Sequence, residues 1–330
     1  MPTLKSTTLA YKKVALTTGD PLGIGFEVAC KALSKLGPQK KVIFFIFRDR
    51  NQEKRQPRYF KLLDQKFLRM TFSDQKAALQ FVNLLIKKNK VPKNLLIDLS
   101  LLESAAEWVL AAAKSCIKKD YDSLATGPLS KVLVKASGLP FVGHTGAFRM
   151  LLPKSKLHMA FLGNKFNVLL ASDHISMSEV PNFLNKKTIL SALESAKKFK
   201  HLIRSRKKIA LLGLNPHAGE KGILGNFEKK VLKNLPANVV GPLVPDAAFF
   251  KSNWAKFSVF VCMYHDQGLI PFKMIHGQDS GVHITIGLPF VRTSVDHGTA
   301  FDIYNKNVAN PASMLDAIRL NLILIRGNNV

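Results

Sequence analysis

Short apolar runs alternate with longer stretches in which apolar residues recur at helical spacing along this chain of 330 residues. Strands are predicted at residues 12–18, 41–47, 94–99, 122–125, 167–172, 208–214, 257–262 and 282–286. Helices are predicted at residues 26–36, 73–87, 100–118, 187–199 and 309–322. Strands and helices that alternate at these lengths favour an α/β fold, with a mostly parallel sheet covered by helices. The charged segment 48–58 is predicted to be a solvated loop.

A glycine-rich turn joins the first predicted strand to the first predicted helix. It reads Gly19-Asp20-Pro21-Leu22-Gly23-Ile24-Gly25. Such a turn can present backbone N–H groups to an anion at the start of the helix. The complete GxGxxG pattern is absent, because Val28 stands at the position of the third glycine. A ligand loop and an ordinary strand-to-helix turn therefore both stay open.

Three of the predicted strands are each followed by a loop that carries a histidine. These histidines are His174, His217 and His265. In parallel α/β sheets, ligands bind beyond the carboxyl ends of the strands, and three imidazoles that converge there can hold one transition metal. The histidines lie 43 and 48 residues apart, so no local spacing rule supports ligation and a structural or surface role remains an alternative.

Polar groups are most concentrated between residues 262 and 302. This segment holds four of the nine histidines, together with aspartates, a lysine, an arginine and five glycines. Loops that carry such groups on a rigid scaffold are where binding and catalytic residues concentrate. We expect this segment to be the centre of the functional site.

Basic residues outnumber acidic residues by 49 to 22, which gives a formal net charge of +27. Such a charge indicates a nucleic-acid or anionic partner, or else a surface on which lysine is the default polar residue. Lysine pairs recur over the whole chain, as at 12–13, 87–88 and 229–230, instead of gathering on one element. No zinc-finger, RNA-recognition or helix-turn-helix pattern accompanies them, so nucleic-acid binding is not expected.

Hydrophobic residues make up 47% of the sequence, which is typical of a soluble globular protein. Uninterrupted apolar runs such as residues 42–47 are far shorter than the ~20 residues of a membrane-spanning helix. The first residues carry charge without a following apolar stretch, so no secretory signal is expected. Three widely spaced cysteines, Cys30, Cys116 and Cys262, imply neither a disulfide framework nor a CxxC metal site. A cytoplasmic protein without a membrane partner is therefore expected.

Sequence motifs in a fixed order along nearly the whole chain resemble those of a known enzyme family. The N-terminal half contributes Gly19-Asp20-Pro21, Gly23-Ile24-Gly25 with Glu27, residues 128–131 and Gly143-His144-Thr145. The C-terminal half contributes residues 215–220, Gly241-Pro242 with Asp246, residues 264–269, Gly287-Leu288-Pro289, Arg292-Thr293-Ser294 and residues 296–300. Together they resemble the 4-hydroxythreonine-4-phosphate dehydrogenase (PdxA) family of pyridoxal phosphate biosynthesis.

The resemblance implies an enzyme that oxidises the C3 hydroxyl of 4-phosphooxy-L-threonine with NAD, or NADP, and then releases carbon dioxide to give 3-amino-2-oxopropyl phosphate. A paralogue that acts on threonate or erythronate 4-phosphate is the alternative. The implied fold is that of isocitrate and isopropylmalate dehydrogenases, two α/β domains with a cleft between them, and not a Rossmann fold. The expected domains are residues 1–135 with 295–330, and residues 136–294, in a homodimer with shared active sites.

The resemblance also implies a divalent metal on His174, His217 and His265, with some of these ligands supplied by the other subunit. Zinc, cobalt and magnesium are candidates, although imidazole ligands suit zinc or cobalt better than magnesium. Asp246 and Asp266 match aspartates that maintain the family's site, where they would orient a ligand or move a proton. Asp246 could also be an ordinary turn residue after a proline.

His144, Thr145, Lys273 and Arg292 match the family's substrate-binding positions, and an arginine can bind a phosphate bidentately. Lys273 could also be an ordinary surface lysine. His283 stands where the family has a substrate-binding asparagine, with one additional residue between Lys273 and that position. Because imidazole titrates near neutral pH, phosphate contact would become pH-dependent here.

The expected cofactor loop resembles the segment that binds the adenosine part of the cofactor in related decarboxylating dehydrogenases. It consists of Asp296, His297, Gly298, Thr299 and Ala300. Two further positions depart from the family pattern: Gly146 replaces a glutamate, and Tyr304-Asn305 replaces an Ala-Gly pair beyond the cofactor loop. His276 matches no role in the family and is predicted to be structural.

Overall fold

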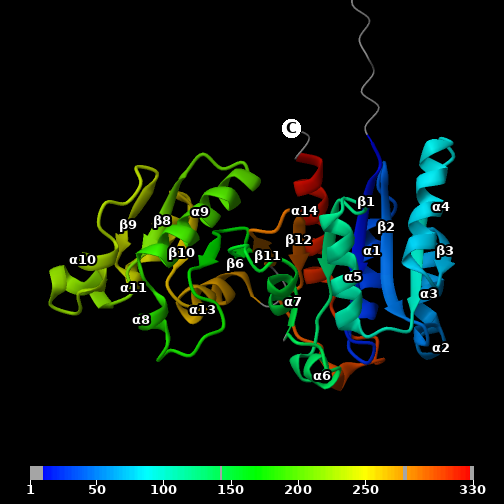
Figure 1. The fold of residues 1–330 in the computed structure, drawn as a ribbon, viewed down its shortest axis with the longest axis horizontal. Helices are drawn as coiled ribbons and strands as arrows, with labels where there is room; N and C mark the ends of the chain where they lie inside the picture. Colours follow the sequence, from blue (N-terminus) through cyan, green and yellow to red (C-terminus); the bar gives the residue numbers. More distant parts are fainter. Residues whose placement is uncertain (1–9, 142, 278–280, 328–330) are drawn as a thin grey trace, which may run out of the picture. The chain divides into compact units, whose positions relative to one another are not determined.

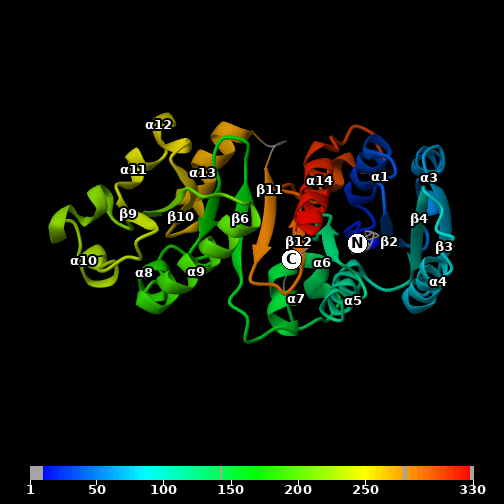
Figure 2. The same cartoon turned by 90° about the horizontal axis from the view of Figure 1, so that it is seen from above.

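The computed structural model describes residues 10–141, 143–277 and 281–327, and the chain divides into two compact units. The first unit comprises Met1–Leu151 and Phe290–Val330, and the second comprises Leu152–Pro289. Figures 1 and 2 show that the C-terminal helix α14 (Ala312–Gly327) returns to the N-terminal elements of the first unit. The expectation about a secretory signal concerns residues 1–9, which lie outside the described residues.

The observed division differs from the expected domain boundaries in two elements. Helix α7 (Gly143–Leu151) and strand β12 (Val291–Ser294) belong to the first unit. Both elements contact the first unit directly: β12 pairs in parallel with β5 (Ser123–Thr126), and α7 packs against α5 (Ala105–Ile117). Three of the expected substrate residues therefore lie in the first unit.

The described strands of the first unit form a parallel sheet in the order β3-β4-β2-β1-β5-β12. The remaining strands are β1 Lys12–Thr17, β2 Val42–Asp49, β3 Leu68–Phe72 and β4 Leu95–Leu101. The remaining helices are α1 Gly25–Leu36, α2 Gln52–Arg55, α3 Pro57–Asp64, α4 Gln75–Lys87, α6 Lys131–Ala136 and the 3-10 turn η2 Phe301–Ile303. The four strands predicted in the first 135 residues are confirmed, whereas β3 and β12 were not predicted.

Helices cover both faces of this sheet, which explains why β2 reads as a continuous apolar run. Phe44 and Ile46 lie in one core cluster with residues of α1, α3 and α14. Phe45 and Phe47 point to the other face, where both rings contact Tyr121 and where α5 packs. Figure 2 shows α1 and α14 on one side of the strands and α5 on the other.

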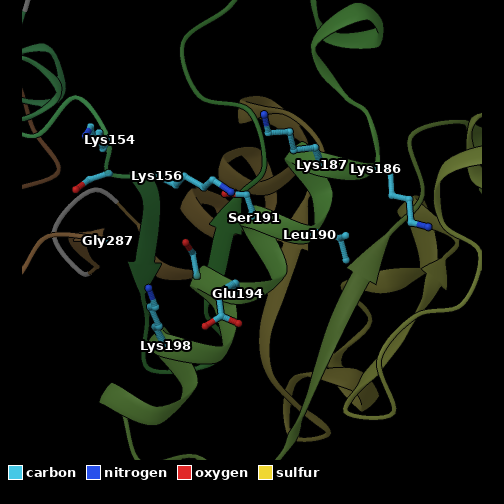
Figure 3. A pocket seen from close by; sticks show the side chains of 11 residues that line it. Lys154, Lys156, Lys186, Lys187, Leu190, Ser191, Glu194, Lys198 and Gly287 are labelled. Atoms are coloured by element: carbon cyan, nitrogen blue, oxygen red, sulfur yellow. The ribbon is translucent and has the colours of Figure 1, made fainter.

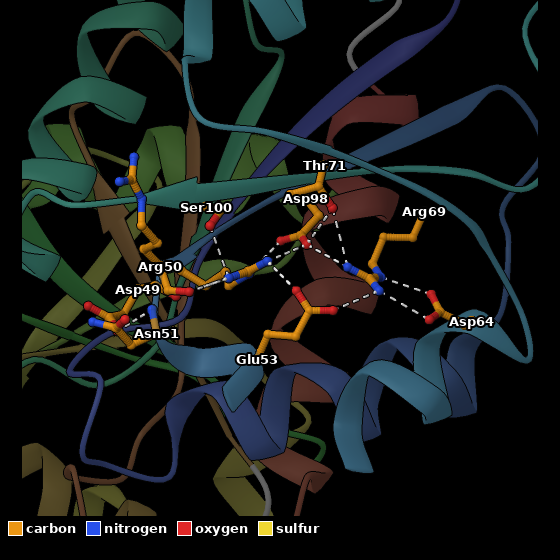
Figure 4. A network of polar contacts seen from close by, with 10 residues as sticks. Asp49, Arg50, Asn51, Glu53, Asp64, Arg69, Thr71, Asp98 and Ser100 are labelled. Atoms are coloured by element: carbon orange, nitrogen blue, oxygen red, sulfur yellow. Dashed lines mark hydrogen bonds and ion pairs between the residues drawn. The ribbon is translucent and has the colours of Figure 1, made fainter. Parts of the chain in front are cut away.

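The prediction of a solvated loop at residues 48–58 is wrong. The segment forms α2 and the start of α3, and Gln52 is buried. Arg48 is only 1% exposed and forms an ion pair with Asp98 on the neighbouring strand β4. Arg69 of β3 binds the same carboxylate (Figure 4). Charged groups can be buried when they are paired, and composition alone does not reveal the partner.

The described strands of the second unit form a mixed sheet in the order β11-β6-β7-β10-β8-β9. Their bounds are β6 His158–Leu162, β7 Val168–Leu170, β8 Lys208–Leu212, β9 Val239–Leu243, β10 Phe257–Cys262 and β11 Val282–Ile286. The strands β11, β6 and β7 pair antiparallel, and β7, β10, β8 and β9 run parallel. The four predicted strands are confirmed, whereas β6 and β9 were not predicted.

Two longer helices, α9 and α13, pack on this sheet. The helices of the unit are α8 Val180–Phe183, α9 Lys186–Leu202, α10 Phe227–Val231, α11 Pro245–Ala248, α12 Lys251–Trp254 and α13 His265–His276, with the turn η1 at Pro216–Gly222. Asn185 and Thr188 begin α9 with a reciprocal capping box. Among the described residues, no helix combines the length and apolar character needed to span a bilayer.

Candidate active site

Two of the three candidate metal ligands lie beyond the carboxyl ends of adjacent parallel strands. β7 and β10 pair in parallel, and the two segments stay together past the strands because the N–H of Ser172 donates to the carbonyl of Met263 at 3.2 Å. This brings the imidazoles of His174 and His265 to a centroid separation of 5.2 Å, with the ring planes at 41°. The expectation that loops after parallel strands share one edge of the sheet holds for this pair.

Asp266 orients the ring of His265. Nδ1 of His265 lies 2.7 Å from Oδ1 of Asp266, so Nδ1–H donates and the carboxylate accepts. This contact leaves the ligand role to Nε2, an arrangement common around protein-bound metals. The side chains are 33% and 66% exposed, so solvent reaches the pair. Two neighbouring imidazoles, one held by a carboxylate, fit a divalent transition metal.

His217 lies in η1, the turn that follows β8, and β8 pairs with β10. Residues 217–221 all have positive φ, between 42° and 82°, a backbone region that non-glycine residues rarely adopt. Glu228 holds the start of this turn. Its carboxylate accepts the backbone N–H groups of Leu214 and Asn215 at 2.8 Å each, and the Asn215 amide at 3.0 Å. Nothing in the sequence pattern had indicated Glu228.

The three histidines do not form one group in the described part of the chain. Among those residues, no three His, Cys, Asp or Glu side chains lie close enough together to hold a metal ion. His174 and His265 come together, and His217 is not part of their pair. The three-histidine metal site therefore stays a prediction.

Asp246 is exposed in the first turn of α11, and α11 packs against η1. An acidic residue after a proline at the start of a helix is favoured by the helix dipole alone. The ordinary structural role and the catalytic role both stay open for this residue.

Two substrate-binding candidates of the second unit lie on α13 and β11. Lys273 is exposed in the last turn of α13. His283 is buried on β11 opposite Phe161 of β6, and the two rings stack with centroids 5.0 Å apart and planes at 24°. The position of His283 is thus set by the packing of two strands. Residues 278–280 of the polar segment lie outside the described residues.

His276 is structural, as predicted. Its Nε2 accepts the N–H of Lys165 at 3.1 Å, and its Nδ1 donates to the carbonyl of Phe272 at 2.9 Å. Burial lowers its pKa, so the ring is held in its neutral form.

Arg292 of β12 is the candidate phosphate ligand of the first unit, and it is only 1% exposed. Its Nη2 donates to Oγ1 of Thr126, and its guanidinium lies 5.4 Å from the centre of the Phe148 ring. Burial lowers the pKa of Arg292 to about 9. Phe148 belongs to α7, which also carries His144 and Thr145. The three candidates therefore lie on two contacting elements.

The predicted cofactor loop, residues 296–300, contacts the glycine-rich turn after β1. The N–H of Ile24 donates to the carbonyl of Thr299 at 2.9 Å. A Cβ atom on Gly23 would lie 2.9 Å from that same oxygen, which is closer than real Cβ contacts allow without a shift. Close packing against Thr299 therefore explains the glycine at position 23 without a bound anion.

Asp20 lies in the same turn, where it belongs to a family-like motif, but no individual role was predicted for it. It is only 4% exposed, and its Oδ2 accepts the N–H of Ser130, the residue that caps α6. Burial raises the pKa of Asp20 to about 6. An aspartate between a glycine and a proline is typical of exposed turns, so the sequence carries no signal of its burial.

Comparison with known proteins supports the resemblance over most of the chain. The family profile described as "Pyridoxal phosphate biosynthetic protein PdxA" matches residues 55–321. A 4-hydroxythreonine-4-phosphate dehydrogenase of Sulfurihydrogenibium sp. (strain YO3AOP1) is 35% identical, over 95% of this chain and 98% of its own length. A D-threonate 4-phosphate dehydrogenase of Pectobacterium atrosepticum is 31% identical, over 94% and 98% respectively.

Solved structures give the same result for the fold. A crystal structure of 4-hydroxythreonine-4-phosphate dehydrogenase from Klebsiella pneumoniae matches with a TM-score of 0.76 and 27% identity, over 96% of this chain and 99% of that one. A β-decarboxylating dehydrogenase from Thermococcus kodakarensis matches with a TM-score of 0.51 and 13% identity, over 96% and 84%. The second likeness concerns the fold alone and confirms the expected fold class. By its profile and its full-length relatives, the chain belongs to the PdxA family and is an oxidoreductase of the dehydrogenase type.

Proposed function

We propose that this chain oxidises 4-phosphooxy-L-threonine with NAD or NADP and releases carbon dioxide to form 3-amino-2-oxopropyl phosphate, in the biosynthesis of pyridoxal 5'-phosphate. One geometric observation carries the proposal beyond the family relationship: the imidazoles of His174 and His265 lie 5.2 Å apart beyond adjacent parallel strands. The proposed setting is the cytoplasm, and the proposed assembly is a homodimer.

A divalent transition metal would be held by His174 and His265, with His217 of the same subunit or His217 of the partner subunit as a third ligand. Bound there, such a metal supplies Lewis-acid chemistry, which lowers the pKa of a hydroxyl and polarises a carbonyl. Asp266 contributes by fixing the His265 ring so that Nε2 is the ligating nitrogen.

The reaction requires the protein to accept one proton and to donate another. Oxidation removes a hydride from C3, which the nicotinamide accepts, and a proton from the C3 hydroxyl. Loss of carbon dioxide then requires a proton at the carbon that carried the carboxylate. Asp266, beside the histidine pair, and Asp246, on a helix that packs against the turn of His217, are the proposed proton carriers.

The substrate phosphate is proposed to bind Lys273 and Arg292, with His144 and Thr145 on the α7 helix that contacts Arg292 through Phe148. His283 is proposed to contribute from the strand β11, where its stacking on Phe161 restricts its movement. The cofactor is proposed to bind residues 296–300, a loop that is tied to the glycine-rich turn by the hydrogen bond between Ile24 and Thr299.

A second candidate substrate is D-threonate 4-phosphate. The relative from Pectobacterium atrosepticum that carries this name matches 94% of this chain. The two substrates share the phosphate and the C3 hydroxyl and differ at C2, which carries an amino group in one and a hydroxyl in the other. Lys273 and Arg292 therefore cannot distinguish between them.

The test is an assay of NADH and NADPH formation with both substrates, on protein stripped of metal and then reloaded with zinc, cobalt or magnesium. We expect turnover of 4-phosphooxy-L-threonine only after reloading. Faster turnover of D-threonate 4-phosphate would select the second candidate. No turnover of either substrate with any metal would reject the proposed reaction.

The role of the histidines is tested separately by metal content. His265→Ala is expected to lose stoichiometric metal binding, whereas the matched variant His201→Ala, which changes an exposed histidine of α9, is expected to retain it. Equal metal content in both variants would reject the proposed ligand set, whatever the activity of the reloaded protein.

A further inference from the structure

A hollow of about 750 Å³ lies in the second unit between α9 and the segment before β6 (Figure 3). Its charged side chains are Lys154, Lys156, Lys186, Lys187, Lys198 and Glu194. None of the residues proposed for substrate, metal or cofactor lines it. The lining thus carries five positive charges against one negative charge, outside the candidate active site.

The five lysines form no ion pairs with carboxylates in the part of the chain that the structure describes. About one residue in seven of the whole chain is lysine or arginine, so a lining of 11 residues would contain one or two by composition. The lining is therefore richer in lysine than the chain as a whole.

Helix α9 places its contribution on one face. Lys187, Ser191, Glu194 and Lys198 follow one another at intervals of three or four residues, which aligns their side chains along a helix. Figure 3 shows the Lys156 side chain extending from the segment before β6 toward Ser191. Basic side chains from two separate segments therefore approach the same space.

Two of the five lysines lie at the start of α9. This helix of 17 residues has Lys186 and Lys187 in its first turn and no acidic residue there. The N-terminal end of a helix carries partial positive charge, so acidic residues are favoured there and basic residues are disfavoured. A bound anion would offset this unfavourable arrangement by pairing with the two lysines, whereas the N–H groups of Lys187 and Thr188 already donate to the Asn185 side chain.

One polar side chain of the lining is fixed in place. Ser195 is only 4% exposed, and its Oγ lies 2.9 Å from Nδ1 of His158 on β6. This contact joins α9 to strand β6. Hydroxyl groups of Ser155 and Ser191 also line the space and can donate to phosphate oxygens.

We propose that this hollow binds a compact small molecule that carries two or more phosphate groups. One phosphate monoester carries a charge of about −1.5 to −2, which five lysines exceed, whereas a diphosphate or triphosphate matches them. The volume lies within the range of about 300–1,000 Å³ that is usual for small-molecule sites. The inference does not rest on the proposed dehydrogenase reaction.

The test is calorimetric titration of the full chain with inorganic tripolyphosphate, in the absence of substrate and cofactor. We expect saturable binding at one site per chain that weakens as salt is raised. The double variant Lys156→Gln with Lys198→Gln is expected to bind about tenfold more weakly, because two attractive charges are lost. The matched variant Lys87→Gln with Lys88→Gln, which removes an adjacent pair at the end of α4, is expected to bind as the unaltered chain does.

Two further variants distinguish a binding site from a merely basic surface. Glu194→Gln is expected to tighten binding about threefold, because the one opposing charge is removed. Lys156→Arg with Lys198→Arg is expected to restore binding, since both charges are kept. A structural role for these residues predicts neither the gain nor the rescue.

Three outcomes would overturn the inference. Many weak sites, or equal loss in the α4 control variant, would show that the binding is diffuse. Tighter binding of a single-stranded oligonucleotide, lost in the same lysine variants, would assign the lysines to a nucleic-acid surface instead. Failure here is distinguishable from failure of the proposed reaction, because tripolyphosphate binding and dehydrogenase turnover are measured separately.

Discussion

Asp98 and Arg48, on the neighbouring strands β4 and β2, form a buried bidentate ion pair. Nε and Nη2 of Arg48 donate to Oδ1 and Oδ2 of Asp98 at 2.8 Å each, and both side chains are 3% exposed or less. Arg69 of β3 donates to the same carboxylate at 2.9 Å (Figure 4). Both guanidinium groups also lie 4.8 Å from the centre of the Phe60 ring. One carboxylate thus joins three adjacent strands of the sheet.

Loss of that carboxylate is expected to be severe. Asp98→Asn would remove the only buried carboxylate that the described residues offer to Arg48 and Arg69, and would leave them only exposed carboxylates as partners. We expect a loss of about 3–5 kcal/mol in the free energy of unfolding. Urea unfolding followed by circular dichroism measures it. Asp64→Asn removes a carboxylate that also pairs with Arg69 but is 47% exposed, and it should cost less than about 1 kcal/mol. Similar losses of unfolding free energy in the two variants would contradict the claim that the buried carboxylate contributes more than the exposed one.

Asp20 is expected to make stability depend on pH in the opposite direction to most aspartates. Burial raises its pKa from an ordinary value of 3.8 to about 6, so between these values the folded protein binds more protons than the unfolded chain. The free energy of unfolding therefore falls as pH rises through this window, by up to about 3 kcal/mol.

The Asp20→Asn variant removes this titration. Near the lower end of the window its free energy of unfolding is expected to equal that of the unaltered protein. Above the upper end the variant is expected to be the more stable of the two. Urea unfolding at several pH values measures both. Asp316→Asn, which changes a 42% exposed carboxylate of α14, is the control and should keep the original slope. Parallel curves for Asp20→Asn and the unaltered protein would refute the assignment.

The approach of His174 and His265 could be predicted from the sequence, because loops after adjacent parallel strands share one edge of a sheet. The place of His217 could not, since it depends on a run of left-handed residues and on Glu228, a residue more than ten positions away in the chain. Arg48 was misjudged for a similar reason. Its partner Asp98 is 50 residues away in the sequence, so the composition of the segment around Arg48 does not indicate the ion pair.

Asp266 is expected to affect metal binding through His265. Asp266→Asn weakens the acceptor for Nδ1–H, and partners of metal-bound histidines typically contribute about 10–100-fold to metal affinity. Competition with a chromophoric chelator measures the affinity for zinc and cobalt. Glu179→Gln, an exposed carboxylate that is hydrogen-bonded to Ser176, is the control. An unchanged affinity in Asp266→Asn, with intact folding, would remove Asp266 from the site.

Arg292 is expected to determine the affinity for the phosphate group. The guanidinium is buried, and a phosphate that contacts it would accept charge-assisted hydrogen bonds in a bidentate arrangement. Arg292→Met should raise KM for the phosphorylated substrate about 10–100-fold. Arg292→Lys should recover only part of the loss, because a lysine cannot bind bidentately.

Two comparisons test whether the rise in KM is specific to the phosphate: one between substrates with and without a phosphate, and one between variants at two arginines. A substrate analogue without the phosphate should show nearly the same KM with the unaltered protein and with Arg292→Met, since the lost interaction is absent in both cases. Arg319→Met, which removes a 54% exposed arginine of α14, should leave both constants unchanged. If KM rises equally for the phosphorylated and unphosphorylated compounds, Arg292 acts through the packing of β12 against Phe148 and not through the phosphate.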